Sequence, residues 1–229
     1  MTTTTAIVAL PEASGGWREI ELSQPRAWAE HPDAFSSRVA FAAAHVVADP
    51  RGENVPGAPA AIDWETTLAF RQHLFRYGLG VAEAMDTAQR NMGLDWPATQ
   101  ELITRSSALA QEHGARIASG AGTDQLLAPA GSLQEVTRAY LEQVEFVETA
   151  GSQVIMMASR HLAALARSAE DYLQVYSTVL AQASRPVILH WLGEMFDPQL
   201  SGYWGSIDIP TATRTFLDLI NEYSAKVDG

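Results

Sequence analysis

A histidine interrupts an apolar segment that is typical of a short buried strand. Pro186 opens the segment, three apolar residues follow, His190 comes next, and Gly193 ends it. Polar residues at the carboxyl end of a parallel strand are positioned for chemistry, because substrate sites form at that end. An imidazole with its ordinary pKa of about 6.5 can move protons near neutral pH. We therefore predict that His190 is a catalytic proton-transfer residue; the alternative is a hydrogen-bonded histidine in the core.

Other polar side chains occupy the same place, at the ends of earlier apolar segments. They are His45, Asp86, Thr87, Thr123, Arg160 and His161. Arginine pairs with carboxylate and phosphate groups, and hydroxyl groups donate to them, so we predict that these residues bind a substrate. The alternative is that they are loop caps or members of solvated ion pairs, since aspartate and threonine favour such positions in any case.

A glycine-rich turn precedes one of these candidates. Gly120, Gly122 and Thr123 predict a tight turn whose free backbone amides face the site and form an anion-binding nest. The spacing is not G-x-G-x-x-G, so no dinucleotide site is predicted. No cofactor and no metal site is expected on the leading interpretation.

The elements that position these residues repeat along the chain as strand–helix units. Strands are predicted over 39–47, 81–85, 116–119, 154–157 and 186–192, and helices over 64–77, 97–113, 132–150, 168–183 and 210–224. Such alternation predicts a parallel α/β fold of the (β/α)8 TIM-barrel type, of which about five units are present. Residues 227–229 resemble the start of a sixth strand.

The first residues predict a separate extension. Segments 6–10 and 17–22 have the composition of two short strands and flank a turn-rich connector, which indicates a β-hairpin. The expected domains are therefore an N-terminal extension, 1–37, and a partial barrel, 38–229.

Composition excludes several classes of protein. The formal net charge is −12, which argues against nucleic acid or an anionic membrane as a partner. The chain contains no cysteine, so disulfides, thiolate metal sites and a cysteine nucleophile are excluded. Neither a signal peptide nor an apolar run of membrane-spanning length is present, so a cytoplasmic location is expected.

Three segments together carry a family resemblance: Gly114-Ala-Arg-Ile-Ala-Ser-Gly-Ala-Gly-Thr-Asp124, the stretch 144–157 with its Ala-Gly before an apolar strand, and 185–192. They resemble the dihydrodipicolinate synthase / N-acetylneuraminate lyase superfamily. The resemblance covers about residues 61–229, and the segment 84–96 is similar to a divergent branch of that superfamily. It implies a (β/α)8 barrel with class I aldolase or lyase activity, in which a lysine on the sixth strand forms a Schiff base with a 2-keto acid.

The chain departs from the superfamily pattern at three positions. His190 stands where the superfamily usually has a tyrosine, and residues 86–89 replace the usual Thr-Thr-Gly-Glu. The only lysine, Lys226, precedes the predicted sixth strand, so the resemblance places the nucleophile beyond Gly229. The chain alone is therefore expected to be inactive and to need a complementary fragment or a homo-oligomer as well as its keto-acid substrate.

Two other interpretations remain open. The first is a metal-assisted barrel enzyme, since nitrogen and oxygen ligands follow several strands. They are His45, Asp86, His161, His190 and Glu194. The second is a non-catalytic half-barrel, because five parallel strands leave two open edges and an unclosed apolar interior that another chain would cover.

Overall fold

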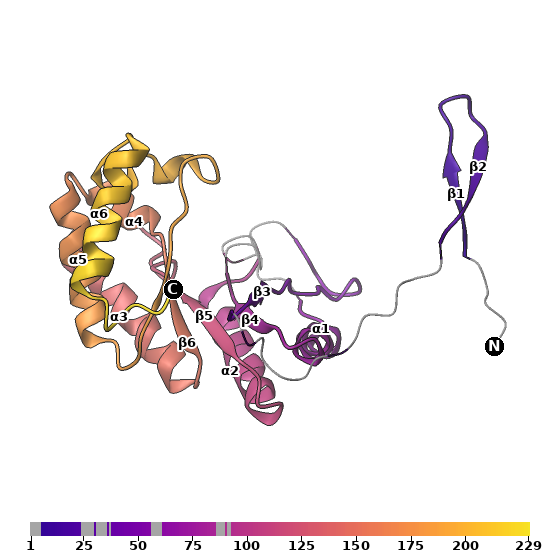
Figure 1. The fold of residues 1–229 in the computed structure, drawn as a ribbon, viewed down its shortest axis with the longest axis horizontal. Helices are drawn as coiled ribbons and strands as arrows, with labels where there is room; N and C mark the ends of the chain where they lie inside the picture. Colours follow the sequence, from indigo (N-terminus) through magenta and orange to yellow (C-terminus); the bar gives the residue numbers. More distant parts are fainter. Residues whose placement is uncertain are drawn as a thin grey trace. The chain divides into compact units, whose positions relative to one another are not determined.

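The computed structural model describes residues 6–23, 30, 36, 38–55, 61–85, 90 and 93–229. The chain divides into two compact units, Met1–Glu30 and His31–Gly229. Each unit has its own secondary structure and is considered by itself (Figure 1).

The first unit contains the predicted β-hairpin. Strands β1 (Ile7–Pro11) and β2 (Trp17–Glu21) pair antiparallel, with Ile7 opposite Glu21 and Pro11 opposite Trp17. Gly15 has a φ of +87° in the connecting turn, a left-handed conformation that glycine adopts without steric cost. The apolar side chains of Ile7 and Trp17 are exposed within the described residues.

The second unit is built on a curled sheet of parallel strands in sequential order. The strands are β3 (Phe41–Ala43), β4 (Gly80–Glu83), β5 (Ile117–Ala121), β6 (Gln153–Met157) and β7 (Ile188–His190). Neighbours in the chain are neighbours in the sheet, as in a half-barrel, so the predicted barrel-type fold is confirmed for these five units.

The last residues continue this sheet. The Val187 N–H donates to the Lys226 carbonyl at 2.8 Å, and the Leu189 N–H donates to the Gly229 carbonyl at 2.8 Å. The Asp228 N–H returns a bond to the Val187 carbonyl at 3.0 Å. Residues 226–229 thus lie parallel to β7, as predicted for the start of a sixth strand.

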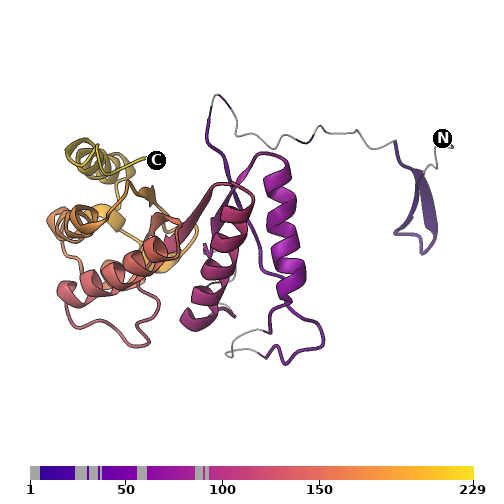
Figure 2. The same ribbon diagram turned by 90° about the horizontal axis from the view of Figure 1, so that it is seen from below.

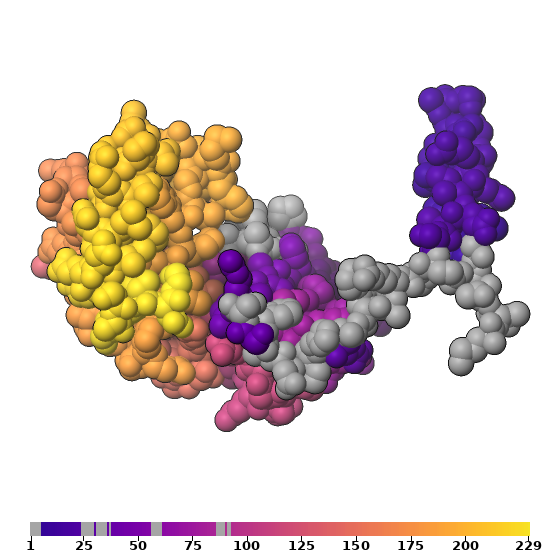
Figure 3. All heavy atoms as spheres, viewed as in Figure 1, coloured from indigo at the N-terminus to yellow at the C-terminus, as the bar shows by residue number. Residues whose placement is uncertain are grey.

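Helices follow each strand. They are α1 (Trp64–Arg76), α2 (Trp96–Glu112), α3 (Leu133–Thr149), α4 (Arg160–Leu165), α5 (Ala169–Gln182) and α6 (Ile209–Glu222). Asp63, Asp95, Ser132 and Asp208 accept a backbone N–H at the starts of four of them and fix where those helices begin. Figure 2 shows α1 and α2 side by side, and in Figure 3 the yellow α6 lies against the orange α5. No helix in the described ranges has the length and apolar character that crossing a membrane requires.

The two faces of the sheet have different surroundings. Val154 and Met156 of β6 belong to the core under the helices, whereas Ile155 and Met157 point to the opposite face. Phe41, Ala82, Ala118 and Ile188 share that second face, and Phe41, Ala82 and Ile188 are only half-buried. The apolar inner face of the half-barrel is therefore incompletely covered by the described residues.

Two predicted strands are shorter than expected, and one helix was missed. The segments 39–47 and 186–192 form strands only over 41–43 and 188–190. β3 lies at the edge of the sheet, where one side of its backbone has no neighbouring strand. Beside β7, residues 226–229 pair only with Val187 and Leu189. No helix is predicted directly after β6, where the structure forms α4 with Ser159 as its N-cap.

Candidate functional site

A cavity of about 360 Å³ opens at the carboxyl ends of β5, β6 and β7. Residues 122–124 follow β5, residues 157–161 end β6 and begin α4, and Phe196, Asp197 and Leu200 belong to the segment after β7. Arg90 approaches from the segment after β4. This is the edge of the sheet at which barrel enzymes hold their substrates, because the loops that follow successive strands converge there.

Two hydroxyl groups and an imidazole form a chain at one wall of the cavity. Thr123 Oγ1 lies 2.6 Å from Ser159 Oγ and 3.0 Å from His161 Nδ1. Ser159 Oγ also accepts the Leu162 N–H at 3.1 Å, which caps α4. Thr123 and Ser159 are buried, while His161 is partly exposed. The hydroxyl chain therefore ends in a side chain that reaches the cavity.

A half-exposed arginine lies beside this chain. Arg160 Nε donates to Asp197 Oδ2 at 2.6 Å, with 51% of the Arg160 side chain exposed and 14% of the Asp197 side chain. Burial raises the pKa of Asp197, but hydrogen bonds from Arg160 and from the Gln199 N–H outweigh it and lower the pKa overall. Asp197 is therefore ionised at neutral pH, and its carboxylate is the partner of the Arg160 guanidinium in this structure.

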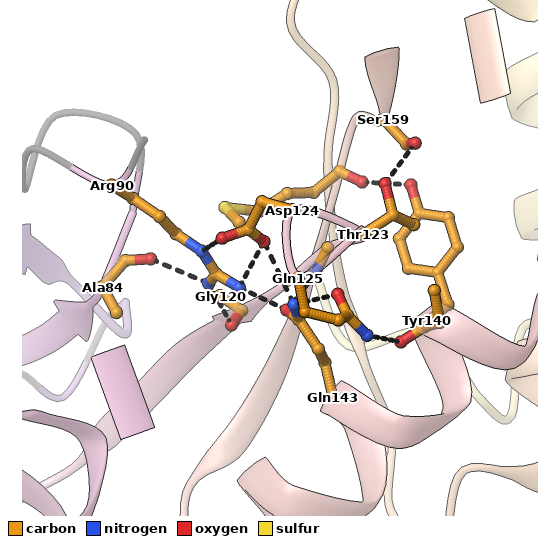
Figure 4. Close-up of polar contacts among 12 residues, drawn as sticks. Ala84, Arg90, Gly120, Thr123, Asp124, Gln125, Tyr140, Gln143 and Ser159 are labelled. Carbon is orange, nitrogen blue, oxygen red and sulfur yellow. Dashed lines mark hydrogen bonds and ion pairs between the residues drawn. The ribbon is translucent and has the colours of Figure 1, made fainter. Parts of the chain in front are cut away.

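A second arginine, Arg90, forms a buried network at the base of the cavity (Figure 4). Its Nε and Nη2 donate to the two oxygens of Asp124 at 2.9 and 2.8 Å, and its Nη1 donates to the Ala84 and Gly120 carbonyls. Its Nη2 also bonds Gln143 Oε1, whose Nε2 donates to Asp124 at 3.0 Å. All five N–H groups of Arg90 thus have protein acceptors, so it orders the site rather than binding a ligand.

The acidity of Asp124 reflects this network. Burial raises its pKa, but the charge of Arg90 and the hydrogen bonds from Arg90 and Gln143 lower the pKa below the ordinary value. The carboxylate stays ionised, and it lines the cavity with 11% of its side chain exposed.

Aromatic residues support the wall from behind. The Ser159 N–H donates to the Tyr203 hydroxyl at 3.0 Å, and Tyr203 lies 3.0 Å from the Tyr176 hydroxyl. Burial raises the pKa of Tyr203, so its phenol stays protonated. Trp204 is buried at a φ of +66° and packs its ring against Tyr172 and Tyr176, a left-handed conformation held by this aromatic cluster.

The structure brings together three of the predicted site residues. Thr123, Arg160 and His161 all line the cavity. His190 ends β7 opposite Met157, a residue of the cavity wall, but it is not itself part of the lining. His45 is exposed, lies outside the lining, and its carbonyl accepts a bond from Arg71. Asp86 and Thr87 lie outside the described residues.

Two further expectations are tested by local contacts. The predicted anion nest is wrong at Gly122, because its N–H is not free but donates to Gln143 Oε1 at 2.7 Å. Lys226 lies at the opposite end of β7 from the cavity, and its Nζ donates to the Ala183 carbonyl at 2.6 Å.

The possible metal ligands do not converge within the described ranges. No group of three His, Asp or Glu side chains there has the arrangement that would hold a metal ion. Glu194 is exposed and accepts a bond from the Ser201 hydroxyl instead.

Sequence reasoning missed four residues of the site: Arg90, Asp124, Ser159 and Asp197. Ser159 could have been predicted, because a serine about one helical turn before an apolar run, here residues 162–165, is an N-cap signal. The other three carry no local signal, since an arginine or aspartate in a loop has the same appearance whether it is solvated or paired in a buried network.

Comparison with known proteins assigns a family. Residues 8–229 match the family described as protein of unknown function (DUF993). The chain belongs to the DUF993 family. The search of curated proteins found no match for this DUF993 chain.

Two solved structures are similar to this DUF993 chain at low identity. One is YagE, a prophage protein of the dihydrodipicolinic acid synthase family from E. coli K12, in complex with pyruvate; the identity is 15%, the match covers 73% of this chain and 47% of YagE, and the TM-score is 0.49. The other is a candidate phosphonomutase from Burkholderia cenocepacia J2315, with 14% identity, 69% and 62% coverage and a TM-score of 0.37. The chain spans about half the length of YagE.

Proposed function

We propose that the cavity binds a small 2-keto acid and that the chain contributes the anion-binding and proton-transfer part of an aldolase- or lyase-type site. One observation carries the proposal: Arg160, His161 and the Thr123–Ser159 hydroxyls meet in one cavity at the carboxyl edge of three consecutive strands. A carboxylate needs a cation, and a keto oxygen needs a hydrogen-bond donor; this wall supplies both.

The residues have separate roles in this proposal. Arg160 exchanges its Asp197 partner for the substrate carboxylate, while His161 donates to a substrate oxygen. His190, at the end of β7 beside Met157, transfers a proton at the neighbouring carbon. The cavity lining contains no lysine, so the chain binds its substrate without a covalent bond, and a Schiff-base lysine would have to come from outside these 229 residues.

Calorimetric titration with pyruvate, the simplest 2-keto acid, tests the proposal. Arg160→Met should weaken pyruvate binding about 10-fold or more, because a charge-assisted hydrogen bond is lost. Arg105→Met is the matched control: Arg105 is also half-exposed and paired with a carboxylate, Glu101, but lies on α2 outside the cavity. Unchanged binding in Arg160→Met, or no binding by the wild type, would contradict the proposal.

Borohydride reduction in the presence of pyruvate tests whether this chain forms a Schiff base. The expected result is a protein mass that does not change in mass spectrometry. The Lys226 amino group donates a hydrogen bond to the Ala183 carbonyl, at the end of β7 that lies away from the cavity. A pyruvyl adduct on Lys226 would show that the site is not the one described.

A second candidate function is completion of the barrel by association with another chain. The half-buried apolar residues of the inner sheet face favour it, since Phe41, Ala82 and Ile188 retain contact with solvent. We expect a mass above that of a monomer in light scattering. A strictly monomeric chain at all concentrations would rule this candidate out.

A further inference from the structure

The cavity has an apolar side as well as the polar wall described above. The apolar residues come from three segments: Leu126 after β5, Met157 and Ala158 at the end of β6, and Leu192, Phe196 and Leu200 after β7. The cavity volume of about 360 Å³ lies within the range of about 300–1,000 Å³ that is typical of sites for drug-sized molecules. Pyruvate alone would leave much of this space to water, so a larger substrate side chain has room beside the apolar surface.

The protein core holds this apolar side in place. Met157 and Leu200 are each only 3% exposed, and the partly buried Leu126 and Leu192 pack against the main hydrophobic core. The Met157 side chain also lies close to the backbone of Gly120, where an added Cβ would meet its sulfur at 2.8 Å. These side chains are therefore positioned before a ligand arrives, which lowers the entropic cost of covering them.

The apolar side borders the guanidinium to which the proposed function assigns the substrate carboxylate. The turn Pro198–Leu200 packs against α4, the helix that begins at Arg160. Asp197, the partner of Arg160, directly follows Phe196 in the chain, and its carbonyl accepts the Leu200 N–H at 2.9 Å. A ligand carboxylate that replaces Asp197 at Arg160 would thus place the rest of the ligand near Phe196 and Leu200.

The charges in the described lining favour a ligand with a single carboxylate. Arg90 and Arg160 are balanced by Asp124 and Asp197, and Arg90 has all its donors engaged. Asp124 stays ionised because its pKa is lowered, and it keeps 11% of its side chain exposed in the cavity. A second carboxylate on the ligand would be repelled by Asp124 and by the displaced Asp197.

We propose that the cavity selects 2-keto acids that carry one carboxylate and an apolar side chain, with Leu126, Phe196 and Leu200 as specificity-determining residues. The inference rests on the proposed function for the keto-acid head group and adds the part of the substrate that faces the apolar side. Each additional CH₂ group buried against apolar side chains strengthens binding, so affinity should rise with the size of the substrate side chain. Pyruvate, with its single methyl group, is then a minimal ligand.

Calorimetric titration of the full chain with three keto acids tests this selectivity. In 4-methyl-2-oxopentanoate an isobutyl group replaces the methyl group of pyruvate, and this ligand should bind about 10-fold more tightly than pyruvate. In 2-oxoglutarate the side chain ends in a second carboxylate, so it should bind at least about 10-fold more weakly than 4-methyl-2-oxopentanoate. Equal affinity for pyruvate and 4-methyl-2-oxopentanoate, or tighter binding of 2-oxoglutarate than of 4-methyl-2-oxopentanoate, would overturn the inference.

Variants of the apolar side test the residues themselves. Phe196 is 57% exposed, so Phe196→Ala should fold normally, and it should reduce the preference for 4-methyl-2-oxopentanoate over pyruvate about 3-fold or more. Leu126→Ala should act in the same way from the segment after β5. Phe70→Ala is the matched control, because Phe70 of α1 is 38% exposed and lies outside the lining. An unchanged preference in both Phe196→Ala and Leu126→Ala would also overturn the inference.

A fourth ligand separates this inference from the proposed function. 4-Methylpentanoate keeps the carboxylate and the apolar side chain but lacks the keto oxygen, so it should bind more weakly than 4-methyl-2-oxopentanoate. Equal binding of these two would reject a 2-keto acid function and leave the apolar selectivity standing. Pyruvate binding without a preference for 4-methyl-2-oxopentanoate would reject the inference and leave the proposed function. Failure of all four ligands to bind would reject both.

Discussion

In the described part of the chain two arginines are completely buried, and each makes a bidentate pair with a carboxylate. Arg71 of α1 bonds Glu83 at 2.7 and 2.8 Å, and neither side chain is exposed. The remaining donors of Arg71 bond the carbonyls of Thr67, Ala44 and His45, so the pair ties α1 to the end of β4 and to the segment after β3. It is a closed structural clamp.

The Arg90–Asp124 pair has the same chemistry in a different place. Arg90 is as buried as Arg71, but Asp124 lines the cavity and keeps 11% of its side chain exposed. A third pair, Arg160–Asp197, is more open still, with 51% of the arginine side chain exposed. The three arginine–carboxylate pairs thus form a series of increasing solvent exposure, from Arg71–Glu83 to Arg160–Asp197.

The largest loss of stability is expected when the Arg71–Glu83 pair is broken. Arg71→Met leaves Glu83 buried without its partner, so the free energy of unfolding should fall by about 3–5 kcal/mol in urea titration. Arg105→Met, at a half-exposed surface pair, should cost less than about 1 kcal/mol. Equal losses in the two variants would show that the Arg71 clamp contributes nothing beyond a surface ion pair.

A smaller effect is expected at the second pair. Arg90→Met should lower the free energy of unfolding by about 2–3 kcal/mol, because water in the cavity can hydrate the partly exposed Asp124 and Gln143 still donates to it. Urea titration beside Arg71→Met makes the comparison. If Arg90→Met lost as much stability as Arg71→Met, hydration from the cavity would not stabilise the unpaired Asp124 carboxylate.

Low pH should weaken the Arg90–Asp124 pair by protonating Asp124. The pKa of Asp124 is lowered in the folded state, so its stabilisation is complete above the ordinary value of 3.8 and is lost as pH falls through the folded pKa. Below about pH 4 the unfolding free energy of Asp124→Asn should vary less with pH than that of the wild type, by at most one proton or about 1.4 kcal/mol per pH unit. Parallel curves of unfolding free energy against pH would contradict this.

The smallest change in stability is expected at the open pair. Asp197→Asn keeps the cap of the turn Pro198–Leu200 but removes the charge that occupies Arg160, so unfolding should shift by less than about 1 kcal/mol. Pyruvate should bind several-fold more tightly, because no internal carboxylate then competes for the guanidinium. Weaker binding in calorimetry would show that Asp197 positions Arg160 for the ligand instead of competing with it.

Much of this architecture could be predicted from the chain alone. The helices predicted over 64–77 and 132–150 are confirmed within a residue or two, as α1 and α3. Thr123, Arg160 and His161 were found because parallel strands share one carboxyl edge, so residues that follow different strands must meet there. Strand lengths at the sides of the sheet were overestimated, since apolar residues can be extended without a pairing neighbour.

The sequence by itself determined the repeat of strands and helices and the helix caps, because these depend on local periodicity and on short-range hydrogen bonds. It also indicated three polar residues at the carboxyl edge, Thr123, Arg160 and His161. Only the tertiary structure decided which charges pair. Arg71 and Arg90 meet carboxylates 12 and 34 residues away, and Arg160 meets Asp197 after 37. Such partners are chosen by burial and geometry after the strands have assembled, and no local pattern encodes that choice.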